Sequence, residues 1–376
     1  MAKVSEKDVL KALGTVQDPD RRQDIVSLGM ISGLAVKDGH VAFSIEVDPQ
    51  RGSKLEPLRK SAEQAVYALS GVNTVSAVLT AERTATAAPQ GGHGHAHGHG
   101  HAHAPAEAPL LPQVKAIIAV ASGKGGVGKS TTAVNLALAL QSLGLSVGMF
   151  DADIFGPSQP RMLGVSGAQP QSPDGQRIDP IEAFGLKVMS MGFLVPEDSP
   201  VVWRGPMVMG ALEQMLRDVN WGELDVLVVD MPPGTGDTQL TMTQKVPLTG
   251  AVIVSTPQDI ALLDARKGLN MFRKVNVPVL GIIENMSTYH CPNCGHEAHI
   301  FGHGGARLEA AKLSTDFLGE LPLAIDIRTT SDEGKPITVS QPDGPHAKAY
   351  KAIAEKVWAK IGVLQGAKKG PKIVMG

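Results

Sequence analysis

Residues 123–131 read GKGGVGKST, and this short segment limits the possible folds of the chain more than any other. Gly123, Gly128, Lys129 and Ser130 fill the fixed positions of the pattern G-x-x-x-x-G-K-S/T. Such glycines let backbone N–H groups converge on phosphate oxygens, the lysine neutralises the β and γ phosphates, and the hydroxyl can bind Mg²⁺. The predicted nucleotide-binding residues of the loop are Gly123, Lys124, Gly125, Gly126, Val127, Gly128, Lys129, Ser130 and Thr131.

The flanking segments fit a phosphate loop. Residues 114–121 (VKAIIAVA) form an apolar, β-branched run that predicts a buried strand. Residues 132–143 (TAVNLALALQSL) repeat apolar side chains at helical spacing. Strand, glycine loop and helix therefore follow one another in the required order, which argues against a glycine-rich turn without a ligand.

Further apolar strand candidates alternate with helical stretches along the rest of the chain. They lie at 145–151, 224–230, 251–256, 279–284 and 317–321. Continuous apolar strands separated by helices predict a parallel sheet covered on both faces, with nucleotide at the carboxyl ends of its strands. The predicted fold class is α/β, a parallel-sheet P-loop NTPase domain at 113–365 followed by a tail at 366–376.

A small α+β domain is predicted to precede it at residues 1–84, since 376 residues exceed the usual size of one core. Residues 5–14 predict a short helix opened by Ser5, and 31–47 predict a hairpin that turns at Asp38-Gly39. Apolar residues at helical spacing follow at 55–69, and a strand is expected near 72–79.

Residues 85–112 consist largely of Ala, Pro, Gly and His, which predicts a flexible linker between the two domains. Six of the twelve histidines lie in it: His93, His95, His97, His99, His101 and His103. Loose capture of a transition metal and a low-complexity linker that tolerates histidine both remain open.

Net charge and hydropathy restrict the kinds of binding partner that the sequence predicts. The formal charge of −2 gives no overall field that favours nucleic acid or an acidic membrane. The amino-terminal sequence MAKVSEKDVLKAL does not resemble a signal peptide, and no apolar run approaches the ~20 residues that span a bilayer. We expect a cytoplasmic protein with neither nucleic acid nor membrane as partner.

Carboxylates follow two of the predicted strands. Asp151 and Asp153 lie in the segment DADIFGPS, and Asp230 ends the strand LDVLVVD. Carboxylates at strand ends beside a phosphate loop can hold Mg²⁺ or orient the attacking water. We assign Asp230 the Walker-B role and Asp153 the water, with Asp151 near the metal; solvated loop acids are the alternative. The predicted catalytic residues are Lys124, Lys129 and Asp153.

The sequence also predicts which nucleobase is bound and which segment responds to the γ-phosphate. No guanine-reading Asn-Lys-x-Asp pattern occurs in the strand-end segment GIIENMSTY, and Asn285 there can offer its amide to adenine, so ATP is the expected nucleotide. Residues 232–237 (PPGTGD) follow the strand that bears Asp230, and their glycines would let the chain follow the γ-phosphate.

Lys124 is a second lysine in the phosphate loop. A loop that already holds Lys129 gains little from another cation on its own phosphates, whereas a cation on the rim can reach nucleotide bound by a second copy. This arrangement predicts a homodimer with facing nucleotide sites.

The only two cysteines, Cys291 and Cys294, lie in the segment HCPNCG. In a reducing compartment such a pair is metal-binding or catalytic rather than a structural disulfide. A zinc site completed by nearby histidines, dithiol–disulfide cycling, and a cluster shared by two chains all remain possible. A dimer brings four thiolates together, the ligand set of a [4Fe-4S] cluster, and the ligand count favours this explanation. The nearby histidines are His296, His299 and His303.

Taken together, the segments SGKGGVGKST, DADIFGPS, VVDMPPGTGD and ENMSTYHCPNCG resemble the Mrp/ApbC family of iron-sulfur cluster carrier ATPases, within the deviant Walker-A, MinD-like group. The resemblance covers residues 113–363. It implies a homodimer that holds a labile [4Fe-4S] cluster between Cys291 and Cys294 of two chains and passes it to apoproteins, with ATP binding and hydrolysis in the cycle. The family's signature-lysine role falls on Lys124.

The amino-terminal segment DPDRRQDIVSLGMI is similar to the small domain of iron-sulfur assembly factors, which implies such factors as partners. That family often has a cysteine after the second strand, where this chain reads VDPQRGSKLEPL. We therefore expect a docking domain rather than a cluster-binding one.

Two other functions fit parts of the sequence. A MinD/ParA-like positioning ATPase needs a basic DNA-facing patch or a terminal amphipathic membrane helix. Tyr350, Ile353, Val357 and Ile361 do recur at helical spacing, but a final helix packed on the sheet explains them more simply. A metallochaperone for zinc or nickel would use the histidine-rich linker and the cysteine pair.

Overall fold

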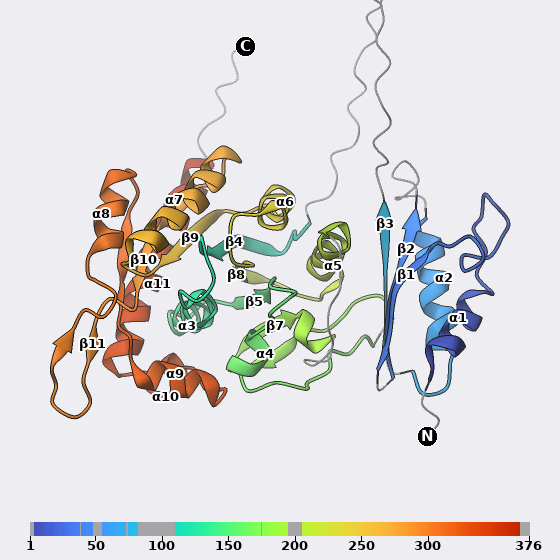
Figure 1. Cartoon of the computed structure of the whole chain (residues 1–376), viewed down its shortest axis with the longest axis horizontal. Helices are drawn as coiled ribbons and strands as arrows, with labels where there is room; N and C mark the ends of the chain where they lie inside the picture. Colours follow the sequence, from blue (N-terminus) through green and yellow to red (C-terminus); the bar gives the residue numbers. More distant parts are fainter. Residues whose placement is uncertain are drawn as a thin grey trace, which may run out of the picture. The chain divides into compact units, whose positions relative to one another are not determined.

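The computed structural model describes residues 4–37, 39–47, 55–72, 74–81, 110–173, 175–194 and 205–368 (Figure 1). The chain forms two compact units. The smaller one comprises Met1–Pro112 with Val202–Ala211, and the larger one comprises Gln113–Val201 with Leu212–Gly376. The histidine tract at 93–103 lies outside the described residues.

The small unit has the predicted α+β elements. They are α1 (Glu6–Leu13), β1 (Ile31–Lys37), β2 (His40–Val47), α2 (Glu56–Tyr67) and β3 (Thr74–Ala81). The sheet order is β1-β2-β3, with β1 antiparallel and β3 parallel to β2. Ser5 caps α1 as predicted, because its hydroxyl accepts from the Asp8 N–H and the Asp8 carboxylate accepts from the Ser5 N–H. Of the predicted turn at Asp38-Gly39, Asp38 lies outside the described residues.

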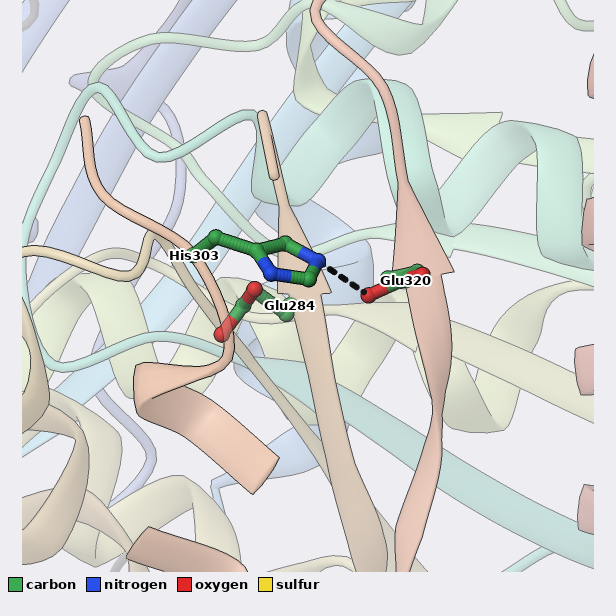
Figure 2. A group of neighbouring side chains, drawn as sticks. All are labelled: Glu284, His303 and Glu320. Carbon is green, nitrogen blue, oxygen red and sulfur yellow. Dashed lines mark hydrogen bonds and ion pairs between the residues drawn. The ribbon is translucent and has the colours of Figure 1, made fainter. Parts of the chain in front are cut away.

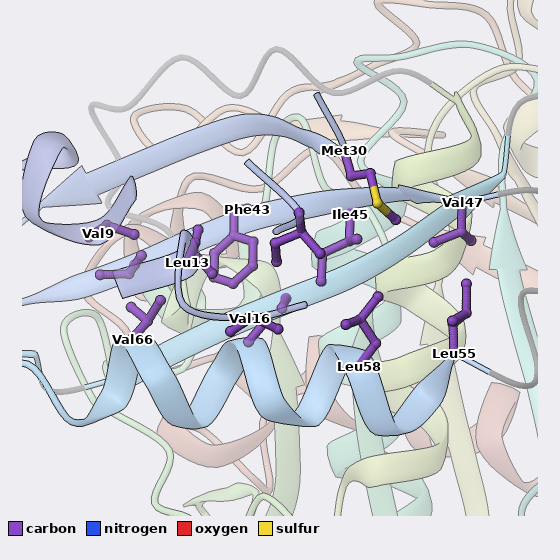
Figure 3. Close-up of a cluster of buried hydrophobic side chains, with 14 residues drawn as sticks. Val9, Leu13, Val16, Met30, Phe43, Ile45, Val47, Leu55, Leu58 and Val66 are labelled. Atoms are coloured by element: carbon purple, nitrogen blue, oxygen red, sulfur yellow. The ribbon is translucent and has the colours of Figure 1, made fainter. Parts of the chain in front are cut away.

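One hydrophobic core holds this unit together. Figure 3 shows the buried side chains gathered between the strands and α2, with Phe43 and Ile45 from β2 facing Leu58 and Val66 from α2. Alternating side chains of a strand face opposite sides, so one face of the sheet carries the core. Val9 and Leu13 of α1 add to it.

The large unit is built on an eight-stranded sheet of order β13-β10-β9-β4-β8-β5-β7-β6. All neighbours are parallel except the edge strand β6, which is antiparallel to β7. The strands are β4 (Val114–Ala121), β5 (Val147–Asp151), β6 (Ile181–Ala183), β7 (Leu186–Ser190), β8 (Leu224–Asp230), β9 (Gly250–Ser255), β10 (Val279–Asn285) and β13 (Phe317–Leu321). The fold class predicted from the alternating apolar runs is confirmed.

Helices cover the sheet (Figure 1). They are α3 (Lys129–Ser142), α4 (Gln159–Met162), α6 (Asp237–Lys245), α7 (Asp259–Lys274), α8 (Gly305–Lys312), α9 (Ile325–Asp332), α10 (Ile337–Ser340) and α11 (Pro345–Lys368), with a 3₁₀ turn at Met191–Phe193. Of α5 (Gly205–Asp218), the part from Leu212 onward belongs to the large unit. Helix α3 is buried from Thr132 to Leu140 because α11 packs against it. A helix that is apolar all round needs such cover on every side.

The apolar side chains along one face of the last helix, α11, are buried inside the protein. Tyr350, Ile353, Val357 and Ile361 are all buried, and α11 contacts α3 and β13. The packing predicted for this helix is confirmed, and this apolar face is not open for a membrane surface. The helix continues to Lys368, past the predicted tail boundary at 365, and residues 369–376 lie outside the described part of the chain.

Within the described ranges, no helix combines the length and apolar character needed to cross a membrane.

Candidate functional site

The phosphate loop connects the end of β4 at Ala121 to the start of α3 at Lys129. Gly126 and Gly128 have φ angles of 80° and 79°, a left-handed conformation that favours glycine. Gly123 has a different reason to lack a side chain, since a Cβ there would lie 2.1 Å from the carbonyl carbon of Asp264 in α7. The Ser122 hydroxyl donates to the Lys124 carbonyl at 2.9 Å and closes the turn. The loop geometry therefore depends on its glycines at three positions.

Lys129, Ser130 and Asp230 lie in one hydrogen-bonded group. The Lys129 ammonium forms a buried ion pair with the Asp230 carboxylate and donates to the Ser130 hydroxyl at 3.0 Å. The Gln159 amide bridges the same group, donating to Asp230 Oδ2 at 2.9 Å and to the Ser130 carbonyl at 3.2 Å. The predicted phosphate-binding lysine, magnesium-binding hydroxyl and Walker-B carboxylate thus meet at one place.

Asp151 is the strand-register partner of Asp230, on the adjacent strand β5. It is fully buried, and its Oδ2 accepts from the Ser158 N–H, the Gln159 N–H and the Ser190 hydroxyl at 3.0–3.1 Å. Burial and the neighbouring Asp230 charge raise the pKa of Asp151 to about 7. Three donors on one oxygen make Asp151 an organiser of the segment that follows β5, and its magnesium role stays a prediction.

Asp153 lies two residues further on and is less enclosed. Its Oδ1 accepts from the Gly156 N–H at 3.3 Å, and burial raises its pKa while the nearby Lys129 charge opposes that shift. An acid with a raised pKa beside the phosphate loop suits a group that orients water. The catalytic assignment of Asp153 stays a prediction.

Two of the predicted nucleotide-binding residues, Lys124 and Asn285, do not belong to the hydrogen-bonded group around Lys129. Lys124 is half-buried, and no ion pair or hydrogen bond of its ammonium occurs among the described residues. Asn285, at the end of β10, donates its amide N–H to the Val127 carbonyl at 2.9 Å. A Cβ on Gly128 would lie 2.2 Å from that amide nitrogen. The Asn285 side chain therefore holds the phosphate loop, and its contact with adenine stays a prediction.

The remaining loop residues follow the expected layout. Gly125 is exposed, Val127 is buried, and the Thr131 hydroxyl donates to the Met162 sulfur at 3.8 Å. In the predicted switch segment, Gly234 has a φ of 98° and donates its N–H to the Ser122 carbonyl at 3.2 Å, so this segment contacts the start of the phosphate loop.

Sequence reasoning missed two contributors to the site. Gln159 lies just beyond the motif DADIFGPS, where an amide near the motif could have been noticed. Ser190 ends β7, a strand that the sequence did not predict, so nothing in the sequence signalled its bond to Asp151.

The cysteine pair lies on a small hairpin between β11 (Tyr289–His290) and β12 (Glu297–Ala298). Cys291 donates its N–H to the His296 carbonyl at 2.9 Å, and Gly295, with a φ of 69°, donates to the Cys291 carbonyl at 2.8 Å. The backbone N–H groups of Asn293 and Cys294, together with the Cys294 thiol, hydrogen-bond the Cys291 sulfur and lower its pKa. The hairpin therefore favours the thiolate at Cys291 and exposes Cys294.

The predicted histidine neighbours do not join the cysteines. Throughout the described segments, no group of three or more metal-ligating side chains includes a cysteine. His299 instead stacks on His303, with ring centroids 4.5 Å apart, and both His290 and His299 lie 3.7 Å from the Glu297 carboxylate. This arrangement weighs against a zinc site completed within one chain.

Comparison with protein families gives two matches. The NUBPL iron-transfer P-loop NTPase family matches residues 113–358, and a family described as iron-sulfur cluster assembly protein matches residues 6–77.

Individual relatives agree with these matches. An iron-sulfur cluster carrier protein of Synechocystis is 46% identical over 359 residues, which cover 94% of this chain and 97% of the relative. The iron-sulfur cluster transfer protein NUBPL of Mus musculus is 57% identical over 250 residues, 66% of this chain and 78% of the relative. Among solved structures, the chain is similar to a nucleotide-binding protein of Archaeoglobus fulgidus, which was solved in complex with ADP and in which cobalt was found. The TM-score is 0.56 and the sequence identity is 38%, over 64% of this chain and 94% of that chain.

Proposed function

The chain belongs to the NUBPL iron-transfer P-loop NTPase family, and from this premise we propose that it is an ATP-hydrolysing carrier of iron-sulfur clusters. The resemblance drawn from the sequence motifs is confirmed by the family matches to both parts of the chain. Its relatives carry the names iron-sulfur cluster carrier protein and iron-sulfur cluster transfer protein.

The phosphate loop would bind Mg-ATP with the residues already gathered around it. Lys129 would turn from Asp230 to the β and γ phosphates, and Ser130 and Asp230 would hold Mg²⁺. Asp153 would orient the attacking water. Because phosphoryl transfer needs little covalent help from the protein, catalysis would rest on positioning and charge.

Lys124 would act on the nucleotide of a second copy. Its ammonium has no ion-pair partner within the described residues, whereas Lys129 is already committed to the chain's own site. A homodimer with facing nucleotide sites gives Lys124 an anionic partner and brings the two cysteine hairpins into one assembly.

The cargo we propose is a [4Fe-4S] cluster held by Cys291 and Cys294 of two chains. The observation that carries this proposal is the hairpin itself: two sulfurs presented from one tight turn, with N–H groups directed at one of them and no third protein ligand grouped with them in the described residues. Two thiolates per chain leave a four-thiolate cluster half ligated, and a second chain completes it.

Exposure of the hairpin suits transfer to apo iron-sulfur proteins, which must reach the cluster. We propose that residues 1–84 form a docking domain for recipients or assembly factors, joined by 85–112 to the ATPase domain at 113–365. The reducing cytoplasm is the compartment in which exposed thiolates would stay available.

Anaerobic reconstitution with iron and sulfide tests the cargo. The expected result is about four iron and four sulfide per two chains, lost in Cys294→Ser. Asn293→Ala is the matched control, because it changes an exposed side chain of the same turn and keeps the backbone N–H that hydrogen-bonds Cys291. Retention of the full iron and sulfide content in Cys294→Ser would contradict the proposal.

A further inference from the structure

Two glutamates lie side by side at the carboxyl ends of adjacent parallel strands. Glu284 of β10 and Glu320 of β13 are register partners, so their side chains share one side of the sheet. Glu284 is fully buried. Like charges directly opposite each other destabilise a sheet, and a buried carboxylate needs compensation.

The protein supplies part of that compensation. Glu284 accepts the Gly304 N–H at 2.8 Å on one oxygen and the Ala306 N–H at 2.7 Å on the other, at the start of α8. His303 Nε2 lies 3.2 Å from Glu320 Oε2. A carboxylate oxygen offers about two acceptor sites, so each oxygen of Glu284 keeps one after these bonds.

The three side chains form a ready set of metal ligands. Figure 2 shows the His303 ring between the carboxylates of Glu284 and Glu320, and one ligand atom from each residue lies within 4.8 Å of the others. The side chains of His303 and Glu320 are 43% and 42% exposed, so solvent reaches the group and could fill further coordination positions. Two carboxylates with one imidazole suit divalent ions such as Fe²⁺, Mn²⁺, Co²⁺ or Zn²⁺ better than soft thiophilic ones.

We propose that Glu284, His303 and Glu320 form a binding site for a divalent transition-metal ion, separate from the cysteines. The cation neutralises the paired carboxylates and joins β10, β13 and the segment before α8. The proposal does not depend on cluster transfer, because it uses no thiolate and no nucleotide residue.

The position of this site links it to the cysteine hairpin. His299 stacks on His303, and its Nε2 lies 3.7 Å from the carboxylate of Glu297 on β12. Strand β12 pairs with β11, which ends one residue before Cys291. A metal at His303 therefore fixes the base from which the cysteines project.

Cobalt binding to the full-length protein tests the site. The thiols and the linker histidines would also take up Co²⁺, so the background variant carries Cys291→Ser, Cys294→Ser and alanine at the six linker histidines. We expect this background to bind one Co²⁺ per chain in equilibrium dialysis. Glu320→Gln and His303→Ala should each weaken binding by about tenfold or more, since each removes a ligand. Glu297→Gln, which changes a neighbouring exposed carboxylate outside the group, should bind as the background does.

Thermal unfolding supplies a second measurement. Bound Co²⁺ should raise the unfolding temperature of the background, because a ligand that binds the folded state stabilises it, and Glu320→Gln should lose that shift while still folding. Glu284→Gln is avoided because Glu284 also holds the start of α8. A background that binds no Co²⁺, or Glu320→Gln and His303→Ala variants that bind it as tightly as the background, would overturn the proposal.

Discussion

The phosphate loop and the cysteine hairpin of the large unit are built in opposite ways. Around the loop, Lys129, Asp151 and Asp230 are buried and each has named partners. The hairpin has two short strands, the Cys291 sulfur is positioned by two backbone N–H groups and the Cys294 thiol, and Cys294 itself is exposed. Phosphoryl transfer gains from a fixed, water-poor charge arrangement, whereas a cargo that must leave requires access.

A contiguous set of contacts connects the two regions. Gly123 packs directly on the α7 backbone at Asp264. Two residues further along α7, the guanidinium of Arg266 forms two hydrogen bonds with Glu309 of α8, at 2.5 and 3.0 Å. The start of α8 is in turn held by Glu284, beside the base of the hairpin. A movement of the loop on nucleotide binding has a physical route to the cysteines.

The largest effect is predicted for a substitution that should abolish the function of the phosphate loop and leave the cysteine hairpin intact. Lys129→Gln removes the charge that neutralises the phosphates while keeping a hydrogen-bond donor for Asp230. We expect ATP hydrolysis to fall by about 10³-fold, the upper range for loss of one transition-state donor. Phosphate release measures this loss.

Iron and sulfide content after reconstitution is the control for that variant, and it should stay at the wild-type level. Loss of the cluster together with hydrolysis would show that the hairpin is not independently built.

Replacing Asp153 with alanine tests the water assignment within the loop region. We expect hydrolysis to fall by about 10²-fold with nucleotide affinity retained, because a water-orienting group acts in the chemical step. Single-turnover hydrolysis and ATP titration measure the two separately. Unchanged hydrolysis would refute the assignment.

Arg266→Ala tests the route between the regions. It leaves the buried Glu309 carboxylate without its guanidinium partner, so the α7–α8 link should loosen. We expect the effect of ATP on the rate of cluster transfer to shrink by about 2–5-fold, in the range of residues that modulate coupling. Lys267→Ala is the matched control, because Lys267 is exposed and its ion-pair partner, Asp264, lies on the same helix. Equal effects of the two substitutions would remove α7 and α8 from the route.

The smallest effect concerns pH. The pKa of Asp151 is raised from an ordinary 3.8 to about 7, so between these values the folded state holds more protons than the unfolded one. The free energy of unfolding should therefore fall as pH rises from about 4 to about 7 and level off above that. Asp151→Asn should flatten this part of the profile, measured by denaturant unfolding at pH 5 and pH 8. An unchanged slope would mean that Asp151 does not titrate in this range.

Local patterns predicted much of the fold. Strands β4 and β8 begin and end at the predicted residues, because the central residues of both strands are buried and apolar. Strand β13 also has its predicted bounds, although it is an edge strand and carries the partly exposed Glu320. The hairpin β6–β7 was missed: β6 is a three-residue edge strand, and β7 follows it after a two-residue turn without a long apolar run.

Within the site, the sequence motifs predicted the candidate phosphate-binding and metal-binding residues. They did not predict the contacts that these elements make with residues far away in the sequence. Asn285 meets the Val127 carbonyl across 158 residues of chain, and Glu284 meets Glu320 only through the register of β10 and β13. Such contacts depend on which strands become neighbours, and a local pattern carries no information about that.

In the proposed carrier, one cluster requires two chains. Native mass spectrometry of the anaerobically reconstituted protein tests it most directly, because it weighs the assembly with its cargo bound. We expect a species whose mass equals two chains plus one [4Fe-4S] cluster, and only cluster-free species from Cys294→Ser. A monomer that carries a complete [4Fe-4S] cluster would contradict it.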